Sequence, residues 1–263
     1  MNIAGLQFDI AWENKRSNFE KVSRLVEAAN LTPGTVLALP ELFAVGFTMD
    51  TERLAEDAGG ETELFLSNLA RKHHLYVVGG VLGRSPSGRG LNQSVAFSPD
   101  GAGLARYTKM QPFVLGGEAN HYDAGRSQCC FKIGDVVVSL HICYDLRFPE
   151  VFRPSARAGA ELYIVIASWP NARLHHWVRL LQARAIENQS FVLGVNRCGS
   201  DPMLNYSGRT LISDPHGEIV ADAADRETVI QHAIDLPSLR QYRQMFPALR
   251  DIRSDIVSPP LAS

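Results

Sequence analysis

The sequence VVVSLHICYDLRFPE (136–150) contains the junction between an expected strand and an expected turn, and both the fold and the chemistry depend on it. Residues 136–142 form a mostly apolar run of strand length, which is typical of a strand buried on both faces. Cys143 ends this run, and the sequence after it predicts a tight turn. A cysteine at such a point has a fixed backbone and an exposed side chain, so the following N–H groups can face an oxyanion. Taken alone, a single cysteine is more often a buried structural residue.

Apolar runs of the same kind recur along the chain at wide spacing, and several are continuous rather than alternating. Amphipathic helical patterns lie between some of them. Two further regions contain the turn sequences SPDG (98–101) and DPHG (214–217) between strand-like segments, which predicts hairpins. The sequence therefore predicts an α/β fold that mixes βα units with hairpins. The expected strands are 3–8, 35–39, 76–82, 93–97, 136–143, 162–168 and 191–195; the expected helices are 14–30, 61–74 and 177–189; the expected hairpins pair 94–97 with 103–107 and 210–213 with 218–221.

The organisation of the 263 residues favours one domain that spans 1–263. The Gly/Ser-rich stretch 83–90 has the length of a loop and not of a linker. Residues 236–263 contain Arg240, Arg243, Arg250 and Arg253 together with several prolines. We expect this segment to be a C-terminal tail and not a second domain.

The composition limits the class of partner. Hydrophobic residues make up 45% of the chain, which is enough for a sizeable core, and the net charge of −2 gives no reason to expect nucleic acid or an acidic membrane as partner. No apolar window is long enough for a membrane span, and the N-terminus lacks the pattern of a secretory signal. The four cysteines show no CxxC spacing, which favours a reduced cytoplasmic location. Paired histidines at 73–74 and 175–176 lack the HExxH pattern, so we expect no metal site.

Two charged residues elsewhere in the chain complement Cys143. Glu41 directly follows an apolar run in LALPELF (37–43), where a carboxylate is costly unless it lies at the rim beside a partner. Lys109 follows an expected hairpin strand in YTKMQPF (107–113). Taken alone, Glu41 fits a solvated loop and Lys109 fits an ordinary surface position. Together the three side chains supply a base, a counter-charge for an oxyanion and a nucleophile.

Three segments of the chain carry a family resemblance: LPELFAVGF (39–47), the segment around Lys109, and HICYDLRFPE (141–150). They resemble the signature segments of the nitrilase superfamily, in the family's order and at family-like separations. The similarity extends from IAGLQFD (3–9) to ISDPHGEIVA (212–221). The resemblance implies that Glu41 is a general base, Lys109 an oxyanion stabiliser and Cys143 a nucleophile. It also implies a four-layer αββα sandwich whose subunits pair as a homodimer.

The resemblance extends to a fourth charged residue. Glu118, in LGGEANHYDAG (115–125), matches a further family carboxylate that positions the substrate and the lysine, and we count it among the catalytic residues. One position departs from the family pattern: many relatives have a histidine two residues after the lysine, where this chain has Gln111. This difference leaves Glu41, Lys109 and Cys143 in place. It concerns only the subfamily to which the chain is assigned.

Three residues are candidates for substrate binding. Tyr144 follows Cys143 and can lend its backbone N–H to an oxyanion hole. Trp169, in ASWPN (167–171), aligns with a family segment that lines the substrate pocket. Arg173 is a candidate to bind a substrate carboxylate, although a surface role explains it equally well. For Arg147 a role in supporting the turn is favoured over substrate contact, and for His141 a place in the core is favoured over a dyad with Cys143.

The leading functional hypothesis is hydrolysis of a small amide to a carboxylate and ammonia through a cysteine thioester, without a cofactor. The motif CYDLRFPE (143–150) is similar to the omega-amidase branch, which implies substrates such as 2-oxoglutaramate and other monoamides of short dicarboxylates. An N-carbamoyl amidase or a nitrilase would use the same three residues. A binding module that retains the fold is the non-enzymatic alternative. The complete set of Glu41, Lys109, Cys143 and Glu118 argues against that last alternative.

Overall fold

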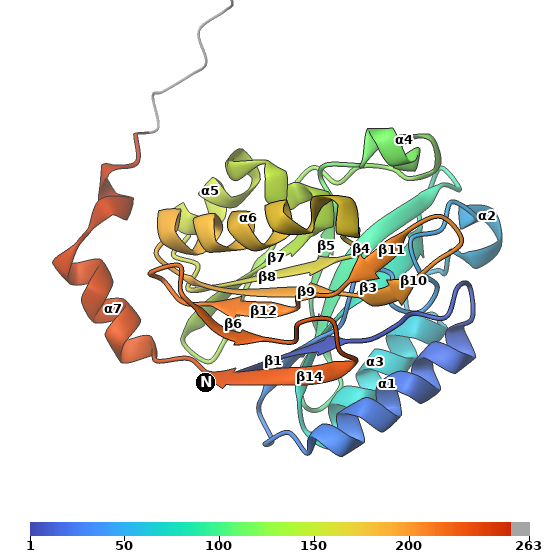
Figure 1. Cartoon of the computed structure of the whole chain (residues 1–263), viewed down its shortest axis with the longest axis horizontal. Coiled ribbons are helices and arrows are strands. Elements are labelled where there is room, and N and C mark those ends of the chain that lie inside the picture. The colour runs from blue at the N-terminus through green and yellow to red at the C-terminus, as the bar shows by residue number, and fades with distance from the viewer. Residues whose placement is uncertain (254–263) are drawn as a thin grey trace, which may run out of the picture.

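The computed structural model describes residues 1–253 and has four layers in the order αββα. Two six-stranded sheets pack face to face in the middle of the molecule (Figure 1). Helices α1 and α3 cover the outer face of one sheet, and helices α5 and α6 cover the outer face of the other. The expected four-layer sandwich of the nitrilase type is confirmed.

The first sheet is mixed and has the order β14-β1-β2-β3-β4-β5. Its central strands β1, β2 and β3 are parallel, whereas β14, β4 and β5 pair antiparallel with their neighbours. The expected hairpin across the turn at 98–101 is confirmed as the β4–β5 pair. The strands are β1 (Asn2–Gln7), β2 (Val36–Ala38), β3 (Tyr76–Arg84), β4 (Gly90–Phe97), β5 (Gly103–Thr108) and β14 (Thr228–Ala233).

The second sheet has the order β13-β12-β9-β8-β7-β6, with β7, β8 and β9 parallel at its centre. The expected hairpin across 214–217 is confirmed as the β12–β13 pair. Two short strands, β10 and β11, form a separate two-stranded sheet, and a single bridge joins Cys198 of β10 to Asp9 beyond β1. The strands are β6 (Cys130–Ile133), β7 (Val136–Ile142), β8 (Leu162–Ala167), β9 (Phe191–Asn196), β10 (Cys198–Ser200), β11 (Asn205–Ser207), β12 (Leu211–Ser213) and β13 (Ile219–Asp222).

The helices begin and end with the expected local chemistry. The side chain of Asn14 caps α1 by accepting a hydrogen bond from the N–H of Ser17 at 3.1 Å, and Asn30 ends the helix in the left-handed conformation. A proline in the first turn opens α5, where its missing N–H is not needed. The helices are α1 (Lys15–Ala29), α2 (Thr51–Leu54), α3 (Glu61–His73), α4 (Glu118–His121), α5 (Pro149–Arg157), α6 (Leu174–Glu187) and α7 (Leu236–Met245), with 3-10 helices at Val114–Gly116, Cys143–Arg147, Asn171–Arg173 and Ala248–Asp251.

The buried side chains form three hydrophobic clusters, one for each interface between layers. One cluster joins α1 and α3 to the first sheet, a second lies between the two sheets, and a third joins the second sheet to α5 and α6. Strands with apolar residues on both faces contribute to two clusters at once; Leu140 and Ile142 of β7 face the other sheet, and Val137 of β7 packs under the helices. This two-sided burial explains why the strand sequences are continuously apolar.

The structure describes the first part of the C-terminal segment that we expected to be a tail. Its first part is the helix α7, capped by Asp235, which runs along one end of the sandwich (Figure 1). Arg240 pairs with Glu161 of the same chain at 2.7 Å, and Arg243 donates to the carbonyl of Ala160 at 2.6 Å. Polar contacts therefore hold a segment whose only buried apolar helix residue is Leu239. Residues 254–263, the end of the expected tail, lie outside the described residues. Within residues 1–253, none of the helices has the length and apolar character needed to cross a membrane.

Candidate active site

The three residues expected to carry the chemistry follow strands that end at the same side of the sandwich. Glu41 comes after β2, Lys109 directly follows β5, and Cys143 directly follows β7. Ser168 directly follows β8, the parallel neighbour of β7, so its backbone lies beside the cysteine turn. Strand ends from both sheets thus bring residues far apart in the sequence into one site.

Glu41, Lys109 and Glu118 form one buried ionic cluster. The Nζ atom of Lys109 lies 2.9 Å from Oε1 of Glu41 and 2.9 Å from Oε2 of Glu118. All three side chains are at most 2% exposed. Two carboxylates therefore share one ammonium away from water, which strengthens the electrostatic interaction.

Neutral hydrogen-bond donors complete this cluster. The amide of Asn92 on β4 donates to Oε1 of Glu41 at 2.7 Å and to Oε1 of Glu118 at 2.8 Å. The N–H of Ser168 donates to Oε2 of Glu41 at 2.7 Å, and the N–H of Phe113 donates to Oε2 of Glu118 at 2.6 Å. Each carboxylate oxygen of Glu41 and Glu118 thus has a donor, which fixes the orientation of both groups.

A glycine allows the Glu41 segment to approach the first sheet. A Cβ atom on Gly80 of β3 would lie 2.3 Å from the backbone nitrogen of Leu42 and 2.7 Å from Cα of Glu41. Neither backbone atom can move without displacing Glu41 from the cluster. Gly80 therefore belongs to the construction of the site although it carries no side chain.

Cys143 adopts a left-handed backbone conformation, with φ of 46°, at the junction of β7 and the 3-10 helix Cys143–Arg147. Such strain in a non-glycine residue is typical of a functional position. The buried carboxylate of Asp145 holds the turn by accepting hydrogen bonds from the N–H of Ile142 at 3.0 Å, the N–H of Gln111 at 3.0 Å and the hydroxyl of Tyr107 at 2.7 Å. Burial raises the pKa of Asp145 to about 6, and these donors oppose the rise.

Lys109 and the thiol of Cys143 both have raised pKa values, which leaves the first group charged and the second neutral. Burial alone would lower the pKa of Lys109, but the attraction of Glu41 and Glu118 outweighs it and raises that pKa well above its ordinary value. Burial, followed by repulsion from Glu41, raises the pKa of Cys143 well above its ordinary value, although Lys109 and the N–H of Ser168 oppose the rise. Lys109 is therefore charged at neutral pH and the resting sulfur is a thiol. Such a thiol needs a base at the moment of attack.

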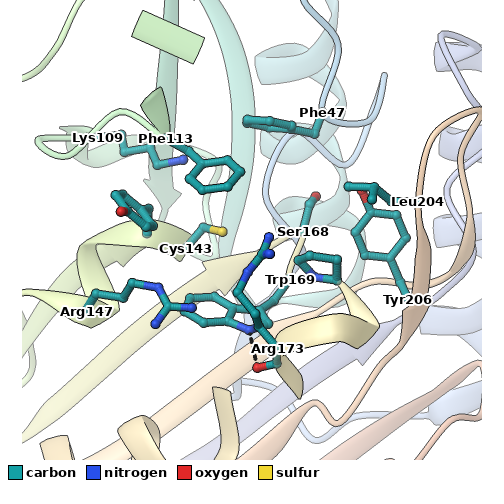
Figure 2. A pocket seen from close by; sticks show the side chains of 12 residues that line it. Phe47, Lys109, Phe113, Cys143, Arg147, Ser168, Trp169, Arg173, Leu204 and Tyr206 are labelled. Atoms are coloured by element: carbon teal, nitrogen blue, oxygen red, sulfur yellow. Dashed lines mark hydrogen bonds between the residues drawn. The ribbon is translucent and has the colours of Figure 1, made fainter. Parts of the chain in front are cut away.

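The sulfur of Cys143 faces a hollow that is partly open to solvent (Figure 2). Arg173 points from below toward Cys143, and Phe47 lies on the opposite side. Lys109 reaches the hollow from the ionic cluster. The lining residues are Phe47, Lys109, Phe113, Cys143, Tyr144, Arg147, Ser168, Trp169, Pro170, Arg173, Leu204 and Tyr206.

Two guanidinium groups of the pocket lack a carboxylate partner among residues 1–253. Arg147 stacks on the ring of Trp169 at 4.7 Å and contacts Nδ1 of His176 at 3.3 Å. The guanidinium of Arg173 lies 5.4 Å from the ring centre of Phe113, and no ion pair or side-chain hydrogen bond holds it within that part of the chain. Burial and then the positive charge of Arg173 lower the pKa of Arg147. Both side chains line the same pocket.

All the candidate residues named from the sequence lie at this one place. Glu41, Lys109 and Glu118 form the ionic cluster, and Cys143 faces the pocket beside them. The three expected substrate-binding residues, Tyr144, Trp169 and Arg173, all line the pocket. The indole of Trp169 is 2% exposed and donates to the carbonyl of Arg173 at 2.7 Å, which fixes the turn that carries this arginine.

Several site residues were missed from the sequence. Arg147 was assigned to support of the turn, yet it lines the pocket, where its cationic group lies beside two aromatic rings. Asn92 is the first of three polar residues, 92–94, within the strand sequence GLNQSVAF (90–97), and this polar run was the available signal. Leu204 and Tyr206 have no local signal, because the short hairpin that carries them reaches the pocket through tertiary packing; Phe47 ends the quoted segment 39–47 but was not singled out.

His141 is a core residue, as favoured from the sequence. It is fully buried and stacks on Phe152 with ring centres 3.8 Å apart, and its Nε2 lies 2.9 Å from the hydroxyl of Ser139. Burial lowers the pKa of His141 to about 3, so the ring is neutral at physiological pH. No group of three His, Cys, Asp or Glu side chains arranged to hold a metal ion is found within the described part of the chain.

Comparison with known proteins agrees with this geometry. Residues 2–244 match the carbon-nitrogen hydrolase family. The chain belongs to this family, the nitrilase superfamily, and is a hydrolase that acts on amide carbon–nitrogen bonds with an active-site cysteine.

Individual relatives cover almost the whole chain. The 2-oxoglutaramate amidase of Bacillus subtilis (strain 168) is 34% identical over 97% of this chain and 98% of its own length. Omega-amidase YafV of Yersinia enterocolitica is 35% identical over 94% of both chains. Among solved structures, a CN-hydrolase superfamily protein of Xanthomonas campestris with an arsenic adduct in its active site is 31% identical, with a TM-score of 0.89 over 98% of this chain and 99% of that one.

Proposed function

We propose that the protein is an omega-amidase that hydrolyses the terminal amide of short dicarboxylate monoamides such as 2-oxoglutaramate. Cys143 is the nucleophile, Glu41 the general base, Lys109 the stabiliser of the oxyanion, and Glu118 the group that positions Lys109. The observation that carries the substrate class is the pair of guanidinium groups, Arg147 and Arg173, which face the pocket without a carboxylate partner among residues 1–253.

The first half of the reaction forms a thioester. Glu41 takes the thiol proton as the sulfur of Cys143 attacks the amide carbon, which explains why a resting thiolate is not required. The amide oxygen becomes an oxyanion beside the ammonium of Lys109. The N–H of Tyr144 is a second donor to the oxyanion. It lies in the first turn of a 3-10 helix, where no backbone carbonyl of a preceding turn can accept it. Glu41 then returns the proton to the nitrogen, the carbon–nitrogen bond breaks, and ammonia leaves.

The second half releases the acid. Glu41 takes a proton from water as its oxygen attacks the thioester carbon, and a second tetrahedral oxyanion forms at Lys109. Its collapse breaks the carbon–sulfur bond, and the proton held by Glu41 returns to the sulfur of Cys143. The donors on Glu41, from Asn92 and the N–H of Ser168, keep the carboxylate pointed at the reacting atoms through both halves.

The charge of the inner cluster explains why an anionic substrate needs an arginine at its far end. Glu41 and Glu118 carry two negative charges against the single positive charge of Lys109, so the inner cluster repels an anion. A substrate with a carboxylate at its far end therefore needs fixed cations at that end of the pocket. Arginine suits this role because its planar guanidinium grips a carboxylate with two parallel hydrogen bonds.

The test compares an anionic amide with a neutral one of similar length. In the wild type, kcat/KM for succinamate should exceed that for butyramide. Arg173→Ala should lower kcat/KM for succinamate by about 10- to 150-fold, which corresponds to about 1.5–3 kcal/mol for a charge-assisted hydrogen bond, and should hardly affect butyramide. Arg24→Ala, on the exposed side of α1, is the matched control.

Two outcomes would contradict the proposal. An unchanged ratio of the two substrates in Arg173→Ala would make Arg173 a surface residue with no role in recognition. Faster hydrolysis of butyramide by the wild type would reject the omega-amidase assignment. Ammonia release without carbon dioxide separates this activity from that of an N-carbamoyl amidase.

We also propose that the protein is a homodimer that pairs through α6 and the segment after Arg147, which includes α5. These helices form the outer layer of the second sheet, and Ile186 of α6 is 51% exposed. Pairing would cover this layer. Sedimentation at micromolar concentration should give about twice the 29.0 kDa of the chain, and a stable monomer would contradict the proposal.

A further inference from the structure

The two sides of the pocket differ in chemistry. One side carries the cations Arg147 and Arg173, whereas the other is formed by Leu204 and Tyr206 (Figure 2). The Tyr206 hydroxyl donates to the carboxylate of Asp201 at 2.6 Å, so the ring and not a free donor faces the substrate. We call Leu204 and Tyr206 the apolar wall. A wall of this kind can limit the size of a substrate but cannot anchor its charge.

The apolar wall stands on a hairpin that lies outside both large sheets and meets the first one at its base, where the N–H of Cys198 donates to the carbonyl of Phe8 at 3.1 Å. Its strands are β10 and β11, and the turn between them is held by Asp201, which accepts from the N–H groups of Met203 and Leu204 at 2.8 Å each. Met203 at the tip is 86% exposed. The position of this wall therefore depends on contacts at the base of the hairpin.

Arg197 supplies those contacts. Its guanidinium stacks on the ring of Tyr206 at 4.4 Å and donates to the carbonyl of Ser200 in β10 at 2.7 Å. The same group donates to Oδ1 of Asp9 at 2.9 Å and to the carbonyl of Ile10 at 3.2 Å, beyond the end of β1. Arg197 thus ties the hairpin and its tyrosine to the first sheet with one planar group.

The burial of Arg197 is not explained by stability alone. The side chain is fully buried, its one carboxylate partner Asp9 is 47% exposed, and its Nη1 atom has no hydrogen bond within residues 1–253. A buried charge with such incomplete pairing is a poor source of stability. An apolar residue of similar volume would fill the space at less cost, but it would not supply the hydrogen bonds from Nη2 to Asp9, Ile10 and Ser200.

We propose that Arg197 is a positioning residue that fixes Tyr206 and thereby limits the length of acyl chain that the pocket accepts. The inference rests on the proposed omega-amidase function only for the charge of the substrate. The length limit applies equally to neutral amides, because the apolar wall carries no charge. Both a charged and a neutral series can therefore test it.

The test measures kcat/KM for succinamate and for adipamate, which is two methylenes longer, and the same quantity for butyramide and hexanamide. Tyr206→Ala should shift the long-to-short ratio toward the longer chain by about 10-fold or more, the scale of discrimination for one or two methylenes. Arg197→Lys should shift it in the same direction by a smaller factor, with KM for succinamate rising more than kcat falls. Met203→Ala, at the exposed tip of the same hairpin, should leave the ratio unchanged.

The double variant separates positioning from a general structural role. If Arg197 acts through Tyr206, Arg197→Lys should shift the ratio no further in a Tyr206→Ala background. An additional shift of equal size there would overturn the assignment, as would an unchanged ratio in Arg197→Lys. If Arg197→Lys does not fold, Asp9→Asn provides a second test, because it weakens the contact with Arg197 from an exposed position. Asp9→Asn should shift the long-to-short ratio in the same direction. An unchanged ratio in that variant would overturn the role assigned to Arg197.

The outcome is distinguishable from failure of the proposed function. If butyramide is the better substrate of the wild type, the omega-amidase assignment fails, and the butyramide-to-hexanamide ratio still tests the wall. If succinamate is preferred but Tyr206→Ala changes neither ratio, the wall inference fails and the substrate class stands.

Discussion

The inner cluster and the arginine side of the pocket use charge in opposite ways. In the cluster, Glu41, Lys109 and Glu118 satisfy one another within 3.1 Å and are at most 2% exposed. In the pocket, Arg147 and Arg173 remain partly exposed and have no carboxylate partner among residues 1–253. Paired charges hold a fixed geometry for chemistry, whereas unpaired charges await a ligand. Under the proposed function, reaction belongs to the first region and recognition to the second.

The largest effect should come from the residue that faces both regions. Cys143→Ala removes the nucleophile and leaves the ionic cluster intact, so the fold should persist while kcat falls by about a thousandfold or more. Steady-state ammonia release and circular dichroism measure the two quantities. Cys130→Ala, at an exposed cysteine outside the pocket, is the control and should retain activity. Activity like that of the wild type in Cys143→Ala would end the cysteine mechanism.

Within the inner cluster, loss of the cation should affect the reaction more than binding. Lys109→Met should lower kcat by about 100- to 1,000-fold, because the ammonium acts most strongly when the oxyanion forms. KM should change less. A variant whose KM rises while kcat is preserved would place Lys109 in recognition and would remove the contrast between the two regions.

In the pocket, loss of a cation should affect binding more than the reaction. Arg147→Ala should raise KM for succinamate by about 10-fold or more, the scale of one charge-assisted hydrogen bond, with kcat changed less. Butyramide kinetics in the same variant provide the comparison. Equal losses for both substrates would mean that Arg147 only supports the cysteine turn, as the sequence first indicated.

The smallest effect is on the pH dependence of stability and comes from His141. This side chain is buried in its neutral form and has no ion-pair partner within residues 1–253. Its pKa is lowered to about 3 by burial, whereas the unfolded chain binds the proton near pH 6.5. Its contribution to stability is therefore present above pH 6.5 and falls by about 1.4 kcal/mol per pH unit as the pH drops toward 3. His141→Gln should flatten this part of the pH dependence in urea unfolding, and His216→Gln, at an exposed histidine, should not. An equally steep dependence in His141→Gln would refute the assignment.

The sequence alone determined the parts of the molecule that have local signals. Continuous apolar runs predicted the central strands, and turn sequences predicted both hairpins, because these patterns reflect burial and backbone conformation within a few residues. The segments at Glu41, Lys109 and Cys143 were recognisable for a related reason. Each places a reactive side chain at the end of such a run.

Tertiary structure decided which of these segments meet and what surrounds them. The helix α5 and the strand β14 were missed, since two prolines within nine residues disguise the first and a half-exposed edge position weakens the pattern of the second. The segment expected to be a tail begins with α7, because Arg240 and Arg243 bind acceptors that come from residues far away in the sequence. Asn92 and Arg147 became site residues only when strands from both sheets ended side by side. Pairing of this kind depends on distances across the fold, which no local pattern records.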